Sequence, residues 1–393
     1  MKTATITLRN GKEQSAKRLH PWIFSGAIAK MSGTPDEGDL VKVYSADGEF
    51  LAIGHYQKSS IAVRILSFND IAIDQNFWNE RIASAYNYRK QLGLVNNSET
   101  NCYRLVHGEG DNLSGLVIDY YNGTAVVQCH SVGMFKNLDC IANALQQTMG
   151  EQLTAIYNKS ESTLPFKAGI ENKDGLLWGE IKTENALEYG NSFFIDWIQG
   201  QKTGFFIDQR ENRKLVEHYA KGKSVLNTFC YTGGFSVYAL RGGAKKVVSV
   251  DCSARAIELT DKTVAMNFPD AEHTSVVSDT FKYLDNNKDE FDLIILDPPA
   301  FAKHGKVLNN ALQGYKRLNM KAIEQIKKGG ILFTFSCSQA VSKEEFRKSV
   351  FAAAANTKRN VRILHQLTQP ADHPISIYHP EGEYLKGLVL QIE

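Results

Sequence analysis

One cysteine of the sequence stands where a reactive thiol is useful, directly after an apolar run. The stretch ILFTFS is followed by Cys337, which lies between two serines. A thiolate is a strong nucleophile even when only a small fraction of the thiol is ionised at neutral pH. A cysteine that ends a buried strand is also a small packing residue, so both interpretations stay open on this stretch alone.

An acid follows another apolar run. FDLIIL continues into DPPAF (297–301), where the acid precedes two prolines. Proline fixes its own φ angle and restricts the residue before it, which holds Asp297 in a defined direction. The ring of Phe301 offers a flat face to a planar base, and Pro298 and Pro299 are expected to line the same substrate position. The alternative is a structural turn, because Asp-Pro commonly opens one.

Three other apolar runs end in residues that suit a nucleoside ligand. In NTFCYTGGFS, Gly233 and Gly234 allow a tight turn and the close approach of a ligand. The loop has neither GxGxxG nor Gly-Lys-Ser/Thr, which favours a ligand without a pyrophosphate. Asp251 ends KVVSVD, where it can accept from ribose hydroxyls, and Asp279 ends TSVVSD, where it can receive an adenine amino group. Each acid alone can be a helix cap, but together with the glycines they predict S-adenosylmethionine as the cofactor.

A thiol and an acid near a methyl donor suit one reaction in particular. Carbon 5 of cytosine is too poor a nucleophile to take a methyl group directly. Addition of the Cys337 thiolate to carbon 6 makes carbon 5 enamine-like, and an acid such as Asp297 near ring nitrogen 3 stabilises the adduct. A base then removes the carbon-5 proton and the thiol leaves. Methylation of an exocyclic amine needs no nucleophile of this kind.

Regular strands and helices are needed to position these residues. From about residue 191 the apolar runs alternate with helical stretches such as SARAIELTDKTVAMN, which predicts a parallel sheet covered on both faces. Ligands of such sheets bind beyond the carboxyl ends of the strands, near the switch point. The runs before Asp297 and Cys337 are expected to be neighbours, so both residues should face one cleft. The first 70 residues predict a small β domain, and residues 71–190 mix strands with helix.

The composition is that of an ordinary globular protein, with 43% hydrophobic and 22% charged residues. Neither a long apolar stretch nor an apolar leader is found, which predicts a mature cytoplasmic protein without a membrane partner. The six cysteines form no CxxC pair, and no histidines stand near them at zinc-ligand spacing, so no disulfide framework and no metal are expected. The net charge is only +2, and residues 71–190 are acidic, so any polyanion should be bound by the two ends of the chain.

These motifs resemble the bacterial 23S ribosomal RNA large-subunit methyltransferase I family, whose members form 5-methylcytosine. The resemblance covers essentially the whole chain and is most specific in GQKTGFFIDQRENR, NTFCYTGGFS, LDPPAF, GYKRLNMKAI, TFSCS and DHPISIYHPEGEYLKG. It implies an α/β protein with a PUA-like RNA-binding domain over 1–70, a small central α/β domain over 71–190 and a Rossmann-like class I S-adenosylmethionine-dependent methyltransferase domain over 191–393. The implied partner is 23S ribosomal RNA, naked or in an assembling large subunit, and a homodimer stays open.

The resemblance also implies roles for individual residues. Cys337 matches the nucleophile of the family and Asp297 its catalytic acid. Ala300 stands where the family often has lysine, so the role of that lysine is not transferred. The base that removes the carbon-5 proton is unassigned, and His304 is one candidate for it. The residues implied to border the cofactor are Lys202, Phe205, Gln209, Arg210, Asn227, Tyr231, Gly233, Phe235, Asp251, Asp279 and Asp297.

Two other functions are weighed against cytosine methylation. An acid-Pro-Pro-x-aromatic motif also serves the methylation of exocyclic or ring nitrogens of ribosomal RNA bases, and Cys337 would then be dispensable. The second alternative is a ribosomal RNA-binding assembly protein whose methyltransferase domain is no longer catalytically active. The intact TGG, Asp251, Asp279 and DPP argue against this alternative, which predicts no affinity for the cofactor.

Overall fold

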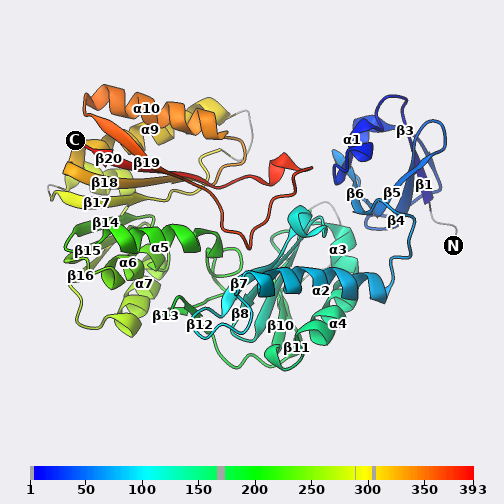
Figure 1. Cartoon of the computed structure of the whole chain (residues 1–393), viewed down its shortest axis with the longest axis horizontal. Coiled ribbons are helices and arrows are strands. Elements are labelled where there is room, and N and C mark those ends of the chain that lie inside the picture. The colour runs from blue at the N-terminus through cyan, green and yellow to red at the C-terminus, as the bar shows by residue number, and fades with distance from the viewer. Residues whose placement is uncertain (1–3, 166–172, 288, 303–306) are drawn as a thin grey trace. The chain divides into compact units, whose positions relative to one another are not determined.

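The computed structural model describes residues 4–165, 173–287, 289–302 and 307–393 (Figure 1). The predicted domain boundaries stay predictions, but the chain does cluster into two compact units. The first unit contains Met1–Gly190, Ile195–Phe205 and Ala371–Gly382, and the second contains Asn191–Phe194, Phe206–Pro370 and Glu383–Glu393.

The N-terminal part of the first unit is a six-stranded sheet with an apolar core. In spatial order its strands are β2 (Trp22–Phe24), β6 (Ile61–Ser67), β5 (Phe50–Tyr56), β4 (Leu40–Tyr44), β1 (Ala4–Leu8) and β3 (Ile28–Ser32), and α1 (Gln14–Lys17) follows β1 in the chain. All neighbouring strands are antiparallel except β1 and β4, which are parallel. Ile6 and Leu8 of β1 and Val41 and Val43 of β4 are fully buried, as the two-residue period of a strand predicts. This part is therefore the small β domain that the sequence predicts.

The rest of the first unit packs helices on a five-stranded sheet. Its strands, in spatial order, are β11 (Gly175–Gly179), β10 (Ala155–Asn158), β9 (Thr124–Cys129), β8 (Leu116–Tyr121) and β7 (Cys102–His107). Its helices are α2 (Gln75–Gln91), α3 (Val132–Lys136) and α4 (Leu138–Met149), and β12 (Asn185–Glu188) also belongs to this unit. Asn122 and Gly123 join β8 to β9 with φ angles of 41° and 104°, the left-handed pair that a two-residue Asn-Gly hairpin requires.

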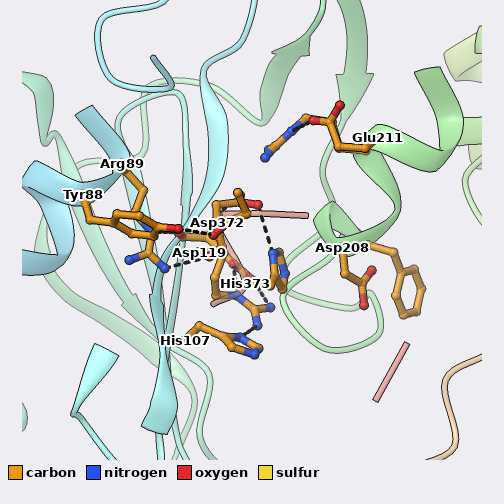
Figure 2. Close-up of polar contacts among 12 residues, drawn as sticks. Tyr88, Arg89, His107, Asp119, Asp208, Glu211, Asp372 and His373 are labelled. Atoms are coloured by element: carbon orange, nitrogen blue, oxygen red, sulfur yellow. Dashed lines mark hydrogen bonds and ion pairs between the residues drawn. The ribbon is translucent and has the colours of Figure 1, made fainter. Parts of the chain in front are cut away.

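A buried network of charges fixes residues 371–382 to the first unit (Figure 2). Arg89 of α2 is fully buried and donates to both carboxylate oxygens of Asp111, at 2.5 and 2.8 Å. It also donates to the carbonyl oxygen of Asp372 at 2.7 Å. The Asp372 carboxylate accepts from the backbone N–H of Arg104 at 3.0 Å, and the Arg104 guanidinium pairs with the buried Asp119. Buried charges are tolerated when they are paired in this way, so the network ties distant parts of the chain together.

The second unit is built around one sheet of seven strands. In spatial order these are β16 (His273–Val277), β15 (Lys246–Asp251), β14 (Ser224–Thr228), β17 (Phe291–Leu296), β18 (Ile326–Ser336), β20 (Lys386–Ile392) and β19 (Val361–Leu367). The first five are parallel, as the apolar runs predict, whereas β20 is antiparallel to both of its neighbours. The strand order reverses between β14 and β17, which makes their carboxyl ends the switch point of the sheet.

Helices cover both faces of this sheet. Figure 1 shows α9 and α10 on one face and α5, α6 and α7 on the other. The helices are α5 (Arg210–Tyr219), α6 (Gly234–Arg241), α7 (Ala254–Asn267), α8 (Thr280–Asn286), α9 (Leu308–Gln325) and α10 (Lys343–Thr357), and the unit also contains the short β13 (Asn191–Phe194). The capping box that SKEE predicts opens α10: Ser342 Oγ accepts from the Glu345 N–H at 3.1 Å, and the Glu345 carboxylate accepts from the Ser342 N–H at 2.8 Å.

Two further expectations concern membranes and metals. In the described ranges, the helices are all too short or too polar to cross a bilayer. Across the same ranges, acids, histidines and cysteines form no group of three or more that could hold a metal ion.

Candidate active site

Cys337 and the DPP motif lie beyond the ends of adjacent strands in the second unit. β17 and β18 pair in parallel with Leu296 opposite Thr334, so Asp297 and Cys337 both follow the carboxyl edge of the sheet. The Cys337 sulfur is 3.9 Å from the carbonyl oxygen of Pro298, and the thiol is half-buried. The fold therefore brings the two predicted motifs together.

Polar contacts fix the chain on both sides of Cys337. Ser336 Oγ donates to the hydroxyl of Tyr315 at 2.9 Å, and Ser338 Oγ donates to the carbonyl oxygen of Ala302 at 2.5 Å. Ser336, Ser338 and Tyr315 are all buried. Because the residues on both sides of Cys337 are anchored, the orientation of its side chain is restricted.

Tyr315 of α9 is a site residue that the sequence reasoning missed. Burial raises the pKa of Tyr315 to about 12, and charges on Cys337 and Asp297 act in the same direction. The phenol is therefore neutral at physiological pH, and both predicted catalytic residues are near enough to influence it. A signal was present, because the tyrosine stands in GYKRLNMKAI, one of the stretches that carry the family resemblance.

The predicted substrate residues differ in their exposure. Pro298 is buried and Pro299 is exposed. The ring of Phe301 is half-buried and packs on Tyr315 with 4.7 Å between the ring centroids. It also fills the space beside Gly314, where an added Cβ would lie 2.9 Å from the ring. Phe301 thus has a packing role, and its stacking on a base stays a prediction.

The loop after β14 has an unusual backbone. Phe229, Tyr231 and Gly233 have φ angles of 55°, 49° and 78°, and the first two are rarely found in this region. Asp251 holds the loop by accepting from the Tyr231 N–H at 3.0 Å, and Thr260 donates to the Tyr231 carbonyl at 2.8 Å. Strained backbone held by surrounding contacts is concentrated at ligand sites, so this loop is a good candidate for the cofactor position.

The loop and Asp251 fit a nucleoside cofactor that lacks a pyrophosphate. Gly233 packs against α7, where an added Cβ would be 2.8 Å from Thr260 Cγ2, so only glycine leaves the loop in this conformation. The partly exposed Asp251 carboxylate accepts from the N–H groups of Tyr231 and Ser253 and still offers oxygen lone pairs to ribose hydroxyls. The neighbouring Cys230 is buried, which raises the pKa of its thiol to about 12 and suits packing better than reactivity.

Replacing Gly233 by alanine is expected to weaken S-adenosylmethionine binding by at least about tenfold, because a left-handed φ and the clash with Thr260 both disfavour the binding-competent loop. Isothermal titration calorimetry measures this loss directly. Gly243→Ala is the matched control, since Gly243 has a φ of 81° but nothing closer than 3.8 Å to an added Cβ. Equal affinities of the two variants would contradict a cofactor role for the loop.

Other predicted cofactor residues are engaged within the second unit. Asp279 is the exposed N-cap of α8 and accepts from the Lys282 N–H at 3.0 Å. It therefore has the helix-capping role that is the alternative to cofactor binding. The Asn227 side chain is fully buried and donates to Ser236 Oγ at 2.9 Å. Phe235 packs on Phe335 with 5.7 Å between the ring centroids. Their contacts to a cofactor stay predictions.

The segment around KTGFFIDQR is divided between the units. Lys202 is exposed and Phe205 is buried in the first unit. Gln209 and Arg210 are buried in the second unit, where Gln209 accepts from Asn212 at 2.6 Å and Arg210 Nε lies 3.3 Å from the Glu211 carboxylate. The cofactor roles of these four residues stay predictions, and His304 lies outside the described residues.

Two neighbours of these residues contact the strained loop directly. The ring of Phe206 meets that of Tyr231 edge to face, with 5.1 Å between the centroids. Arg213 is buried, donates to the Phe206 carbonyl at 2.9 Å and lies against Gly234. Both stand in GQKTGFFIDQRENR, but nothing in the sequence distinguished them from the residues beside them.

Comparisons with known proteins agree over the whole chain. Residues 103–378 match the S-adenosylmethionine-dependent methyltransferase family, and residues 6–68 match a PUA-like domain. The chain is 41% identical to the ribosomal RNA large subunit methyltransferase I of Aeromonas hydrophila over 99% of each protein, and 40% identical to that of Alteromonas mediterranea with the same coverage.

Solved structures show the same fold. A Streptococcus mutans protein assigned as a SAM-dependent methyltransferase has a TM-score of 0.84 at 24% identity, covering 98% of this chain and 99% of its own. A methyltransferase structure complexed with SAH has a TM-score of 0.85 with the same identity and coverage. The α/β fold with an N-terminal PUA-like domain, predicted from the sequence, is confirmed.

Proposed function

The chain belongs to the S-adenosylmethionine-dependent ribosomal RNA large subunit methyltransferase I family, and from this premise we propose that it methylates carbon 5 of a cytosine in 23S ribosomal RNA. The observation that carries the proposal is the position of Cys337, whose sulfur is 3.9 Å from the carbonyl of Pro298 in the DPP motif. A nucleophilic thiol is needed for carbon-5 methylation and is superfluous for methylation at nitrogen.

The chain's residues would act in the following order. The Cys337 thiolate attacks carbon 6 of the cytosine, the new S–C bond forms, and the ring π-electrons shift so that carbon 5 becomes nucleophilic. Asp297, held by the two prolines that follow it, hydrogen-bonds ring nitrogen 3 and stabilises the adduct. After the methyl group is in place, a base takes the carbon-5 proton, the S–C bond breaks and the thiolate is restored.

The cofactor would be held by the strained loop after β14 and by Asp251. When bound, S-adenosylmethionine supplies an electrophilic methyl group. The loop conformation requires glycine at 233, and the Asp251 carboxylate, which accepts from two backbone N–H groups, still has oxygen lone pairs for ribose hydroxyls. Phe206 and Arg213 contact the loop and help to hold it in place.

Recognition of RNA is assigned to the PUA-like residues 6–68 and to the residues beside the thiol. Enzymes that modify a base extrude it from its stack into a pocket. Pro298, Pro299 and Phe301 follow Asp297 directly and would border that base. A partner with a negatively charged backbone makes binding dependent on salt.

The proposal is tested by identifying the product. Purified protein is incubated with labelled S-adenosylmethionine and unmodified 23S ribosomal RNA, and the RNA is digested to nucleosides. Label is expected in 5-methylcytidine alone. Label in a methylated adenosine, in a methylated guanosine or in N4-methylcytidine would overturn the proposal while leaving the family assignment intact.

A further inference from the structure

A buried lysine lies beside the loop that carries Cys337. Lys386 is the first residue of β20, directly opposite Ser336 of β18, and only 4% of it is exposed. Its ammonium group donates to the carbonyl oxygens of Ser338 and Val341, both at 2.6 Å. A lysine this deeply buried is rare unless it is paired with an opposite charge.

The usual partner of a buried lysine is a carboxylate. Within the described parts of the chain, no carboxylate lies within ion-pair distance of the Lys386 ammonium, whose contacts are the two carbonyls. The charges that influence it come from several elements. Cys337, Glu383 and Glu345 raise its pKa, Lys343 lowers it, and Cys337 has the largest effect of these four. Of these four side chains, Cys337 acts most strongly on the Lys386 pKa, and it lies at the start of the segment whose Ser338 and Val341 carbonyls hold the ammonium group.

The geometry also fixes where the positive charge sits. Ser338 and Val341 follow Cys337 on one short segment, and both direct their carbonyls at the ammonium group. The same segment is tied to the DPP side of the site, because Ser338 Oγ donates to the carbonyl of Ala302. Burial lowers the pKa of Lys386 to about 8, so the side chain is still mostly charged at neutral pH.

We propose that Lys386 is the counter-charge of the Cys337 thiolate, a positioning residue that stabilises the ionised sulfur and so increases the fraction of the thiol able to attack. The inference rests on the proposed function for its purpose, since a stabilised thiolate matters when Cys337 is the nucleophile. The interaction itself is independent of RNA and of methyl transfer, so it can be tested separately.

The test follows alkylation of Cys337 by iodoacetamide as a function of pH, resolved by peptide mass spectrometry, in the full chain without RNA. The exposed Cys252 is the reference thiol in the same sample. Lys386→Gln removes the charge and keeps amide donors for the two carbonyls. We expect the Cys337 midpoint to rise by about one to two pH units, which makes alkylation at pH 7 about tenfold slower or more, while the Cys252 midpoint stays unchanged.

Matched variants separate the charge from the packing. Lys386→Arg keeps the charge and should keep the wild-type midpoint of Cys337, and Lys348→Gln removes an exposed lysine from α10 and should leave that midpoint unchanged. If the glutamine variant does not fold, Lys386→Met also removes the charge, although it leaves the two carbonyls without this donor, and the Cys337 midpoint should rise in the same way. If Lys386 had only a structural role, its replacement would change the rate of Cys337 alkylation at high pH but would not shift the pH midpoint of that reaction.

The two proposals fail in different ways. An unchanged Cys337 midpoint in Lys386→Gln overturns the counter-charge, whatever the methylation activity. A shifted midpoint in a protein whose Cys337→Ala variant still forms 5-methylcytidine upholds the counter-charge and overturns the nucleophile.

Discussion

A Cys337→Ala variant is expected to form 5-methylcytidine at least about a thousandfold more slowly than the wild type, because removal of a nucleophile eliminates the covalent route altogether. The measurement is the initial rate of label incorporation into 5-methylcytidine from S-adenosylmethionine and 23S ribosomal RNA. The affinity for S-adenosylmethionine, measured by calorimetry, should change little, because Cys337 is not part of the strained loop or of the Asp251 contacts that are proposed to hold the cofactor.

The matched control removes a cysteine that lies outside the candidate active site. Cys140 is a half-buried cysteine of α4 in the first unit, and Cys140→Ala should retain the rate within about twofold, as expected for a substitution away from the site. If Cys337→Ala were as active as Cys140→Ala, Cys337 would be the packing residue that ends a strand, and the covalent mechanism would be wrong.

The second large effect is on stability and is expected in the first unit. Arg89→Met should lower the free energy of unfolding of this unit by about 3 to 5 kcal/mol, because it leaves the Asp111 carboxylate and the Asp372 carbonyl buried without their donor. All four tryptophans of the chain (22, 78, 178 and 197) belong to the first unit. Tryptophan fluorescence during urea titration therefore reports its unfolding selectively.

Lys90→Met is the matched control for this variant. Lys90 is the next residue of α2 and is exposed, so its replacement removes the same charge from the same helix without touching the network. Its effect should stay within about 0.5 kcal/mol. Equal midpoints for the two variants would show that the network does not stabilise the unit.

Much of the site could be predicted because parallel sheets follow simple rules. Near-continuous apolar runs identified β14, β15, β17 and β18, and the rule that ligands bind beyond strand ends selected the residues that follow them. This rule alone selects Asp297 and Cys337, without the family resemblance. Their adjacency needed only that the two strands be neighbours, which the sheet order confirms.

The contributions of distant segments could not be predicted. β20 is inserted antiparallel between β18 and β19, so a lysine near the C-terminus is placed opposite Ser336. VRILHQL and YLKGLVLQIE are expected to pair as the last two strands, which the structure confirms, but nothing in YLKGLVLQIE indicates that β18 is its other neighbour. Residues 371–382 cluster with the first unit for a similar reason, since Asp372 finds its partners more than 260 positions earlier in the chain.

Local chemistry also limited the predictions. An acid that ends a strand can be a helix cap or a ligand-binding residue, and Asp279 caps α8. In the sequence, Tyr315 is indistinguishable from any other apolar residue on one face of a helix. The contact between its hydroxyl and Ser336 is seen only in the folded structure. Side-chain roles of this kind depend on which elements pack together, and single-sequence patterns do not contain that information.

The central claim is tested most directly by trapping the covalent adduct. 23S ribosomal RNA transcribed with 5-fluorocytidine carries no proton at carbon 5, so the final elimination is blocked after methyl transfer. The account predicts a protein–RNA complex that survives denaturation, requires S-adenosylmethionine, is absent in Cys337→Ala and carries the nucleotide on the Cys337 peptide. Methylated product without any such complex, or a complex through another residue, would contradict it.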